Sequence, residues 1–171
     1  MIKRFCLLTL FLLCAIIATA QIQRKILDFT LGVTTKVQVQ NYLKSHHYKY
    51  HLNEDGDFIV EKVTFAGHNW PAAFFCFYKG KLFLVDFRNN DDFTPVETMD
   101  LIWERLSNSL KKKYSNYSFS SSKDDGSLNF SDHKTRLTTN YTYLFGSKSL
   151  HIMYYDEYLF GQKYESDESE L

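Results

Sequence analysis

The sequence predicts an α+β protein built from two tandem units, each a helix followed by a four-stranded antiparallel sheet. Aromatic residues make up 17% of the chain, with 15 Phe and 12 Tyr, and aromatic side chains favour strands. Two segments repeat apolar residues at helical spacing, and strand-like runs joined by tight turns follow each of them. We expect a signal peptide at residues 1–20, the first unit at 21–92, the second unit at 93–155 and an acidic tail at 156–171.

The first twenty residues have the pattern of a cleavable signal peptide. Residues 1–4 form a short basic start, an apolar run extends over residues 5–18, and small residues precede Gln21 as they do at a cleavage site. The apolar run is shorter than the roughly 18 residues that a membrane-spanning helix needs. We therefore expect an exported, soluble mature chain that begins at Gln21, does not span a membrane and acts in the periplasm or as an extracellular protein.

Composition argues against nucleic acid and anionic membranes as partners. The whole chain has 20 basic and 20 acidic residues, and removal of Lys3 and Arg4 with the signal peptide leaves 18 basic residues against 20 acidic ones. This balance provides no basic field to hold phosphate groups.

Cysteine usage predicts an inert thiol. Cys6 and Cys14 leave with the signal peptide, so the mature chain keeps Cys76 alone and has no internal disulfide. Cys76 lies within an aromatic run, and apolar surroundings raise the pKa of a thiol. We expect Cys76 to be buried; a disulfide to another chain or a reactive thiol is the alternative.

The first predicted helix is short. Thr34 or Thr35 provides its N-terminal cap, and His46-His47 marks its end. The side chains expected to face inward are Val37, Tyr42 and Leu43.

The second predicted helix extends over residues 95–113. It begins with a capping box at Thr94-Pro95-Val96-Glu97, and three lysines at its end complement the helix dipole. Its apolar stripe, which should pack against the sheets, consists of Met99, Ile102, Trp103, Leu106 and Leu110.

Four strand-like runs follow each predicted helix. After the first helix they are residues 48–52, 58–66, 72–78 and 81–88, and after the second they are residues 117–121, 127–131, 134–145 and 148–155. A two-residue loop at Gly146-Ser147 would pair Tyr143 with Leu150. The strands on both sides of this loop would then present one apolar face to a helix.

The turn at Lys79-Gly80 predicts a hairpin with two apolar faces. A two-residue loop gives one face made of Phe75, Phe77, Leu82 and Leu84, and an opposite face made of Phe74, Cys76, Phe83 and Val85. A single helix can cover only one face, so the other must contact the second unit, a partner or a ligand. We select Phe75, Phe77, Leu82 and Leu84 as candidate binding residues; the alternative is that they form ordinary core.

Two short motifs accompany this order of elements. Phe29-Thr30-Leu31-Gly32 precedes the first predicted helix, and Phe65-Ala66-Gly67 ends a predicted strand. Over roughly residues 28–155 the chain resembles the β-lactamase-inhibitor-protein-like fold and a set of small, uncharacterised secreted bacterial proteins that share these motifs. The resemblance implies a protein-binding module and transfers no catalytic residues.

Three groups of polar residues contain types used in catalytic or metal sites. His46, His47 and His51 cross from helix to strand, which breaks the convergence that a zinc site needs. In residues 53–57 the glycine is misplaced for a calcium loop, so a hairpin turn is expected. Ser131-Asp132-His133 is expected to be a turn, because side chains adjacent in sequence point apart. We expect no metal, no cofactor and no enzymatic activity.

Two hypotheses of function follow. The leading one is a non-enzymatic extracytoplasmic module that binds another protein through an aromatic sheet face, since Phe and Tyr offer a large contact area at low entropic cost. The alternative is a carrier of a small apolar ligand in a cavity between the sheets, which needs a pocket of at least ~300 Å³. A hydrolase is a third hypothesis, but no set of residues in the sequence fits the roles that hydrolysis needs.

Overall fold

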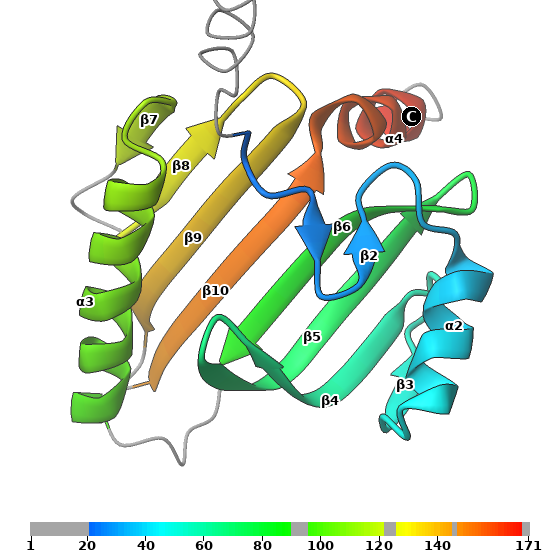
Figure 1. The fold of residues 1–171 in the computed structure, drawn as a ribbon, viewed down its shortest axis with the longest axis horizontal. Coiled ribbons are helices and arrows are strands. Elements are labelled where there is room, and N and C mark those ends of the chain that lie inside the picture. The colour runs from blue at the N-terminus through cyan, green and yellow to red at the C-terminus, as the bar shows by residue number, and fades with distance from the viewer. Residues whose placement is uncertain (1–20, 90–95, 122–125, 145–146, 169–171) are drawn as a thin grey trace, which may run out of the picture.

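The fold is α+β and is dominated by one antiparallel sheet (Figure 1). The computed structural model describes residues 21–89, 96–121, 126–144 and 147–168, so the predicted signal peptide lies outside the described residues. The helices are α2 (Lys36–Ser45), α3 (Val96–Lys113) and α4 (Glu157–Glu168). The strands are β1 (Lys25–Ile26), β2 (Phe29–Thr30), β3 (Tyr50–Leu52), β4 (Phe58–Phe65), β5 (His68–Tyr78), β6 (Lys81–Asn89), β7 (Ser118–Ser121), β8 (Leu128–Ser131), β9 (Thr135–Leu144) and β10 (Ser147–Asp156).

The eight described strands from β3 to β10 form a single sheet in the order β3-β4-β5-β6-β10-β9-β8-β7. Each half of this order runs through consecutive hairpins, and the antiparallel pairing of β6 with β10 joins the halves. The strands β1 and β2 form a separate small hairpin.

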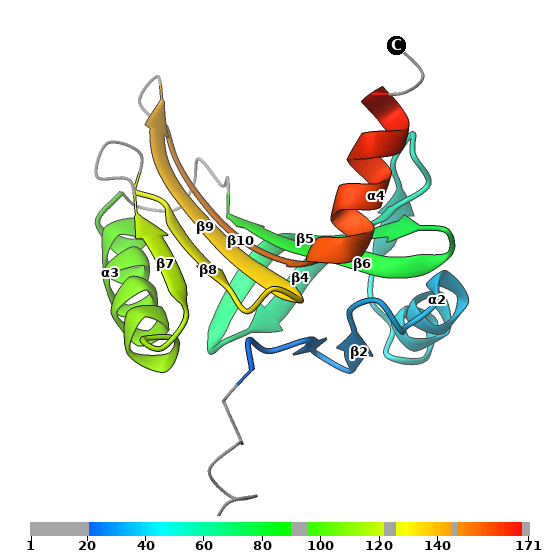
Figure 2. The same ribbon diagram turned by 90° about the horizontal axis from the view of Figure 1, so that it is seen from above.

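The sheet has a covered face and an open face. Among the described elements, Figure 2 places α2, α3 and the β1–β2 hairpin on one side of the sheet and α4 on the other. We call the first side the covered face; its side chains include Phe75, Val85, Phe87, Ile152 and Tyr154. The opposite side is the open face; its side chains include Phe74, Leu84, Asp86, His151 and Met153.

Helix α2 begins as the sequence predicts. Thr35 is its N-cap and forms a reciprocal capping box with Gln38. The buried residues are Val39 and Leu43, whereas Val37, which we expected to face inward, is exposed. Positions four residues apart lie on one face of a helix, so burial of Leu43 selects Val39 and leaves Val37 outside.

Helix α3 packs its predicted stripe on the covered face. Met99, Leu106 and Leu110 are buried. Trp103 is only partly buried and stacks on Tyr141 of β9, with ring centroids 5.5 Å apart. Three lysines occupy the last turn, as expected, while the predicted capping box at residues 94–97 lies outside the part of the chain whose side chains are described.

The predicted acidic tail is instead largely helical, because α4 begins directly after β10. The Asp156 side chain accepts a hydrogen bond from the Leu159 backbone N–H at 3.0 Å, which caps the helix. The Phe160 ring stacks on Tyr155, with centroids 4.4 Å apart, and lies near the buried Phe83. The aromatic residues at the start of the tail thus pack α4 against the sheet. Within the described residues, no helix has the length and apolar character needed to cross a membrane.

Candidate functional site

The four candidate binding residues do not share one face of the sheet. Phe75 and Leu82 are fully buried on the covered face, and Phe77 is partly buried there against Phe58. Leu84 pairs with Cys76 and with Tyr155, so its side chain lies on the open face and is partly exposed. The predicted grouping of Leu84 with the other three is therefore wrong, and a surface made of all four residues does not exist.

A β-bulge causes this difference. Phe77 pairs with Leu82 as a two-residue loop requires, but Cys76 pairs with Leu84, so the register shifts and Phe83 is left as the extra residue. A one-residue shift moves every later side chain to the opposite face of the sheet. The Phe77 backbone N–H at the bulge donates to the Asp57 carboxylate at 2.9 Å. Asp57 therefore supplies the acceptor that an unpaired strand amide needs.

The exposed part of the open face has an aromatic, cationic and thioether centre. The guanidinium of Arg88 lies over the ring of Phe74 at 3.8 Å from the ring centroid, which is a close cation–π contact. Asp86 of β6 pairs with Phe74 on one side and with Met153 of β10 on the other, and Met153 is partly exposed. We call Phe74, Arg88 and Met153 the open-face centre.

A buried carboxylate holds the open-face centre in place. The Asp86 side chain is only 2% exposed, and one of its oxygens accepts a hydrogen bond from Arg88 Nε at 2.5 Å. Its other oxygen, Oδ1, has no hydrogen-bond partner among the described residues, and His151 Nδ1 lies 3.7 Å from it. A buried carboxylate needs a positive partner. Arg88 is therefore fixed by Asp86 from below and by Phe74 from the side.

Cys76 lies beside this centre on the open face and is partly buried. Burial raises the pKa of its thiol far above the usual value, and the nearby carboxylates of Asp57 and Asp86 add to the effect. The thiolate that would act as a nucleophile is thus strongly disfavoured. This agrees with the expected inert thiol, although the side chain is less buried than predicted.

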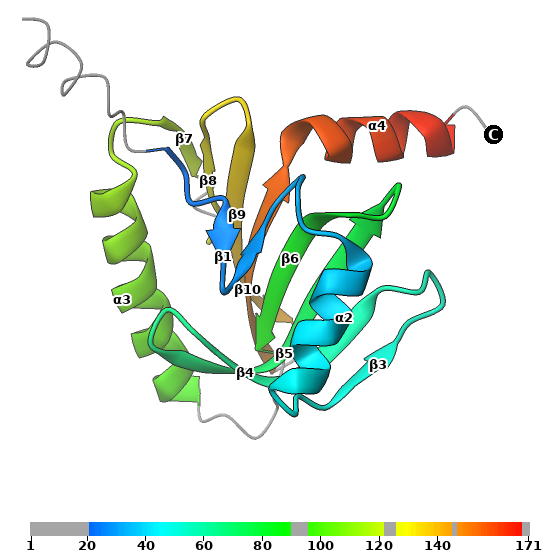
Figure 3. The same cartoon turned by 45° about the vertical axis from the view of Figure 1, so that its right-hand side comes forward.

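A separate pocket lies on the covered face, where α3 meets the tip of the β4–β5 hairpin. The volume of the pocket is about 370 Å³. Figures 1 and 3 agree in placing this hairpin tip beside α3. The lining residues are Gln23, Phe65, Ala66, His68, Arg105, Leu106, Ser109, Leu110, Lys113, Ile152 and Tyr154.

The Ser131-Asp132-His133 motif, whose residue types occur in catalytic sites, has a structural role. Asp132 accepts hydrogen bonds from the backbone N–H groups of Ile22, Lys134 and Thr135, so it stabilises a turn and ties down the N-terminal segment. The side chain of His133 in the same turn is exposed. This arrangement is the turn that the sequence predicts.

The three histidines near the end of α2 were expected not to form a zinc site. His46 stacks on Tyr42 at the end of α2, while His51 is exposed on β3. No group of three or more potential metal ligands comes together in the described part of the chain.

Sequence reasoning missed both the open-face centre and the pocket. The polar alternation of Asp86 and Arg88 after an apolar run was a usable signal for the open face. For the pocket there was no such signal, because it depends on contact between a hairpin tip and a helix more than 30 positions further along the chain (Phe65 to Leu106). Comparisons with protein-family models, curated proteins and solved structures found no match for this chain.

Proposed function

We propose that the protein is a non-enzymatic module that binds another protein through the open face of its sheet. The observation that carries this proposal is the open-face centre, in which Arg88 is held between Phe74 and Asp86 with Met153 beside them. Aromatic residues, Met and Arg are the residue types enriched at the core of protein interfaces. The open-face centre therefore has the composition expected of an interface.

Preorganisation supports this function further. An arginine that is already fixed loses little conformational entropy when a partner contacts it. Asp86 also pairs with the Arg88 charge, which lowers the desolvation cost of covering the site. The open-face centre replaces Phe75, Phe77, Leu82 and Leu84 as the proposed docking surface, with Leu84 alone retained at its edge.

The test compares two aromatic-to-acid variants. Phe74→Asp places a charge in the open-face centre, whereas Tyr143→Asp changes an exposed aromatic residue on the other face and is the matched control. We expect a partner captured from the cell envelope by the wild-type protein to be retained by Tyr143→Asp and lost by Phe74→Asp. Equal capture by both folded variants would refute docking at this face.

We propose that the two halves of the chain are copies of one unit, as in the β-lactamase-inhibitor-protein-like fold. The support is the order of elements, because α2 precedes β3–β6 and α3 precedes β7–β10. The mirrored strand order on either side of the β6–β10 pair also supports it. An experimental structure in which the two halves do not superpose would overturn this proposal.

We also propose that the protein is exported and that its mature chain begins at Gln21. Ile22 is fully buried and Arg24 donates to the carbonyls of Leu31 and Lys134, so the fold uses the chain from just after the expected cleavage point. Mass spectrometry of the protein recovered from the cell envelope should give the mass of a chain without residues 1–20. Recovery of the full-length chain would contradict this.

A second candidate function is a carrier of a small ligand, and the pocket of about 370 Å³ favours it. The pocket lies between α3 and a hairpin on one face of a continuous sheet, so the expected cavity between two sheets is replaced by this location. Native mass spectrometry of the protein purified from its own envelope should reveal a bound small molecule. A ligand-free spectrum under conditions that preserve weak complexes would count against this function.

A further inference from the structure

The pocket on the covered face has apolar walls and a cationic rim. Leu106, Leu110, Ile152 and Tyr154 are nearly buried and form its floor and one wall. Arg105, Ser109 and Lys113 are exposed and follow one another at four-residue steps along α3. Four-residue steps keep side chains on one side of a helix, so these three form a polar row above the apolar floor.

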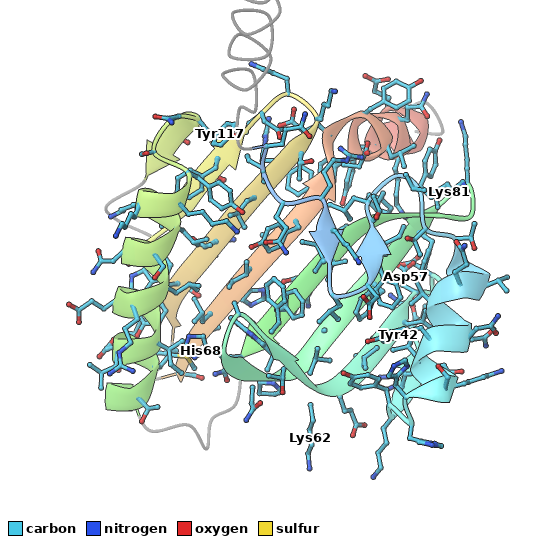
Figure 4. The ribbon with its side chains drawn as sticks, in the orientation of Figure 1. Tyr42, Asp57, Lys62, His68, Lys81 and Tyr117 are labelled. Carbon is cyan, nitrogen blue, oxygen red and sulfur yellow. The ribbon has the colours of Figure 1, made fainter. Side chains whose placement is uncertain are left out.

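The wall opposite α3 is closely packed. The Phe65 ring stacks on Phe87 at 4.2 Å between centroids and meets Tyr154 edge-on. The Trp70 indole donates a hydrogen bond to the Phe65 carbonyl at 3.0 Å, which fixes the backbone at the hairpin tip. Figure 4 places His68 at this tip, on the side towards α3. A preformed wall of this kind is typical of small-molecule sites.

The charges at the rim have one sign. The lining residues include two cations and no carboxylate. Arg105 makes no ion pair or hydrogen bond with any residue in the described ranges, and Lys113 Nζ donates to the amide oxygen of Gln23 at 3.0 Å. Both cations can therefore still contact an anion at the mouth of the pocket.

We propose that the pocket binds a small amphiphile with one apolar chain and an anionic head group, such as a carboxylate. The apolar chain lies against Leu106, Leu110 and Ile152, where it displaces water that the apolar walls cannot hydrogen-bond. The head group lies at the rim, between Arg105 and Lys113. This inference rests on the second candidate function and names its ligand class.

The experiment uses sodium decanoate and its uncharged analogue decanol with the mature wild-type protein. Titration calorimetry measures affinity, and amide NMR shifts locate the site. We expect decanoate to bind at least about tenfold more tightly than decanol, with the largest shifts at Leu106, Leu110 and Ile152. Each single change, Arg105→Gln or Lys113→Gln, should weaken decanoate about threefold, as for a solvent-exposed ion pair, and leave decanol unchanged.

Two matched controls separate site effects from general ones. Lys112→Gln removes a charge from the same helix outside the pocket lining and should leave binding unchanged. Ser109→Phe fills the pocket and should abolish binding, whereas Asn108→Phe, on an exposed neighbouring position outside the lining, should not. Both Phe variants put the same ring on α3, so a difference between them reports the pocket and not the fold.

The possible failures are distinguishable. If decanol binds as tightly as decanoate and the charge variants have no effect, the anionic preference is overturned while the carrier function stands. If neither compound binds, or if the shifts lie on the open face, both the ligand class and the carrier function fail.

Discussion

We expect that glycine is required at position 32, where the N-terminal segment contacts the start of α4. Its φ of +76° lies in the left-handed region, and a Cβ added there would be 2.5 Å from Asp156 Oδ2 and 3.0 Å from Arg24 Nη2. Asp156 caps α4 and pairs with Arg24, so any larger residue at position 32 must separate this ion pair. The prediction is a large loss of stability from the smallest possible change, Gly32→Ala.

Two contributions add up for Gly32→Ala. The left-handed backbone costs an alanine about 1–2 kcal/mol. Displacement of the buried Asp156 carboxylate from Arg24 costs roughly a further 1.5–2 kcal/mol, the low end for a charged hydrogen bond, because Arg24 keeps the carbonyls of Leu31 and Lys134 as acceptors. The total is about 3 kcal/mol, which corresponds to a fall in Tm of roughly 6–12 °C for a domain of this size.

Urea unfolding followed by circular dichroism measures the effect, and Gly67→Ala is its control. Gly67 has nearly the same φ, +77°, but nothing lies within 4 Å of the Cβ position, so this variant reports the backbone cost alone. In an Asp156→Ala background, the cost of Gly32→Ala should fall to that of Gly67→Ala. A difference below about 0.5 kcal/mol between the two Gly→Ala variants would refute the collision argument.

Four further outcomes follow from local contacts. Asp57→Ala should destabilise the protein by about 1–2 kcal/mol in urea unfolding, and Asp57→Asn by less, because only Ala removes the acceptor for the bulge amide. Cys76 in the native protein should react with a thiol reagent at pH 8 far more slowly than in urea, because burial raises its pKa; equal rates would contradict this. Hydrogen bonds from Lys148 and then Tyr141 lower the pKa of the exposed Asp100. The Asp100 carboxylate therefore stabilises the fold above its unfolded pKa of about 4, and this contribution is lost as the pH falls through its lower folded pKa. An NMR titration should show that the pKa of Asp100 is higher in Lys148→Met than in the wild-type protein. Phe160 is only partly buried, so Phe160→Ala should cost roughly 2 kcal/mol, less than the roughly 3–5 kcal/mol for a fully buried Phe, and should make α4 sensitive to proteolysis. An unchanged digestion rate would show that the helix is held by other contacts.

The two long hairpins explain how far the sequence determined the faces of the sheet. For β9 and β10 the predicted partner of Leu150 was Tyr143, and the observed partner is Tyr141. This two-residue shift preserves the faces, so the apolar side of the hairpin was assigned correctly. For β5 and β6 the shift is one residue, and it reversed the assignment of Leu84.

The bulge itself was not readable from local pattern. The residues around it, Leu82, Phe83, Leu84 and Val85, are all apolar, so no polar position marks which side faces out. The acceptor that stabilises the bulge, Asp57, comes from a turn about twenty residues earlier and reaches it only in the folded chain. Strand existence follows from aromatic content and turns, but register at a bulge depends on such tertiary partners.

Strand β10 connects the two proposed sites. Its side chains alternate, so Ile152 and Tyr154 line the pocket while His151 and Met153 belong to the open face. Because these side chains leave a shared backbone in opposite directions, a ligand in the pocket and a partner on the open face cannot touch. Any coupling between them must pass through movement of β10, which is paired with β9 along its whole length and with β6 from Leu150 to Tyr155. A central strand held on both edges resists such movement, so the two sites should bind independently.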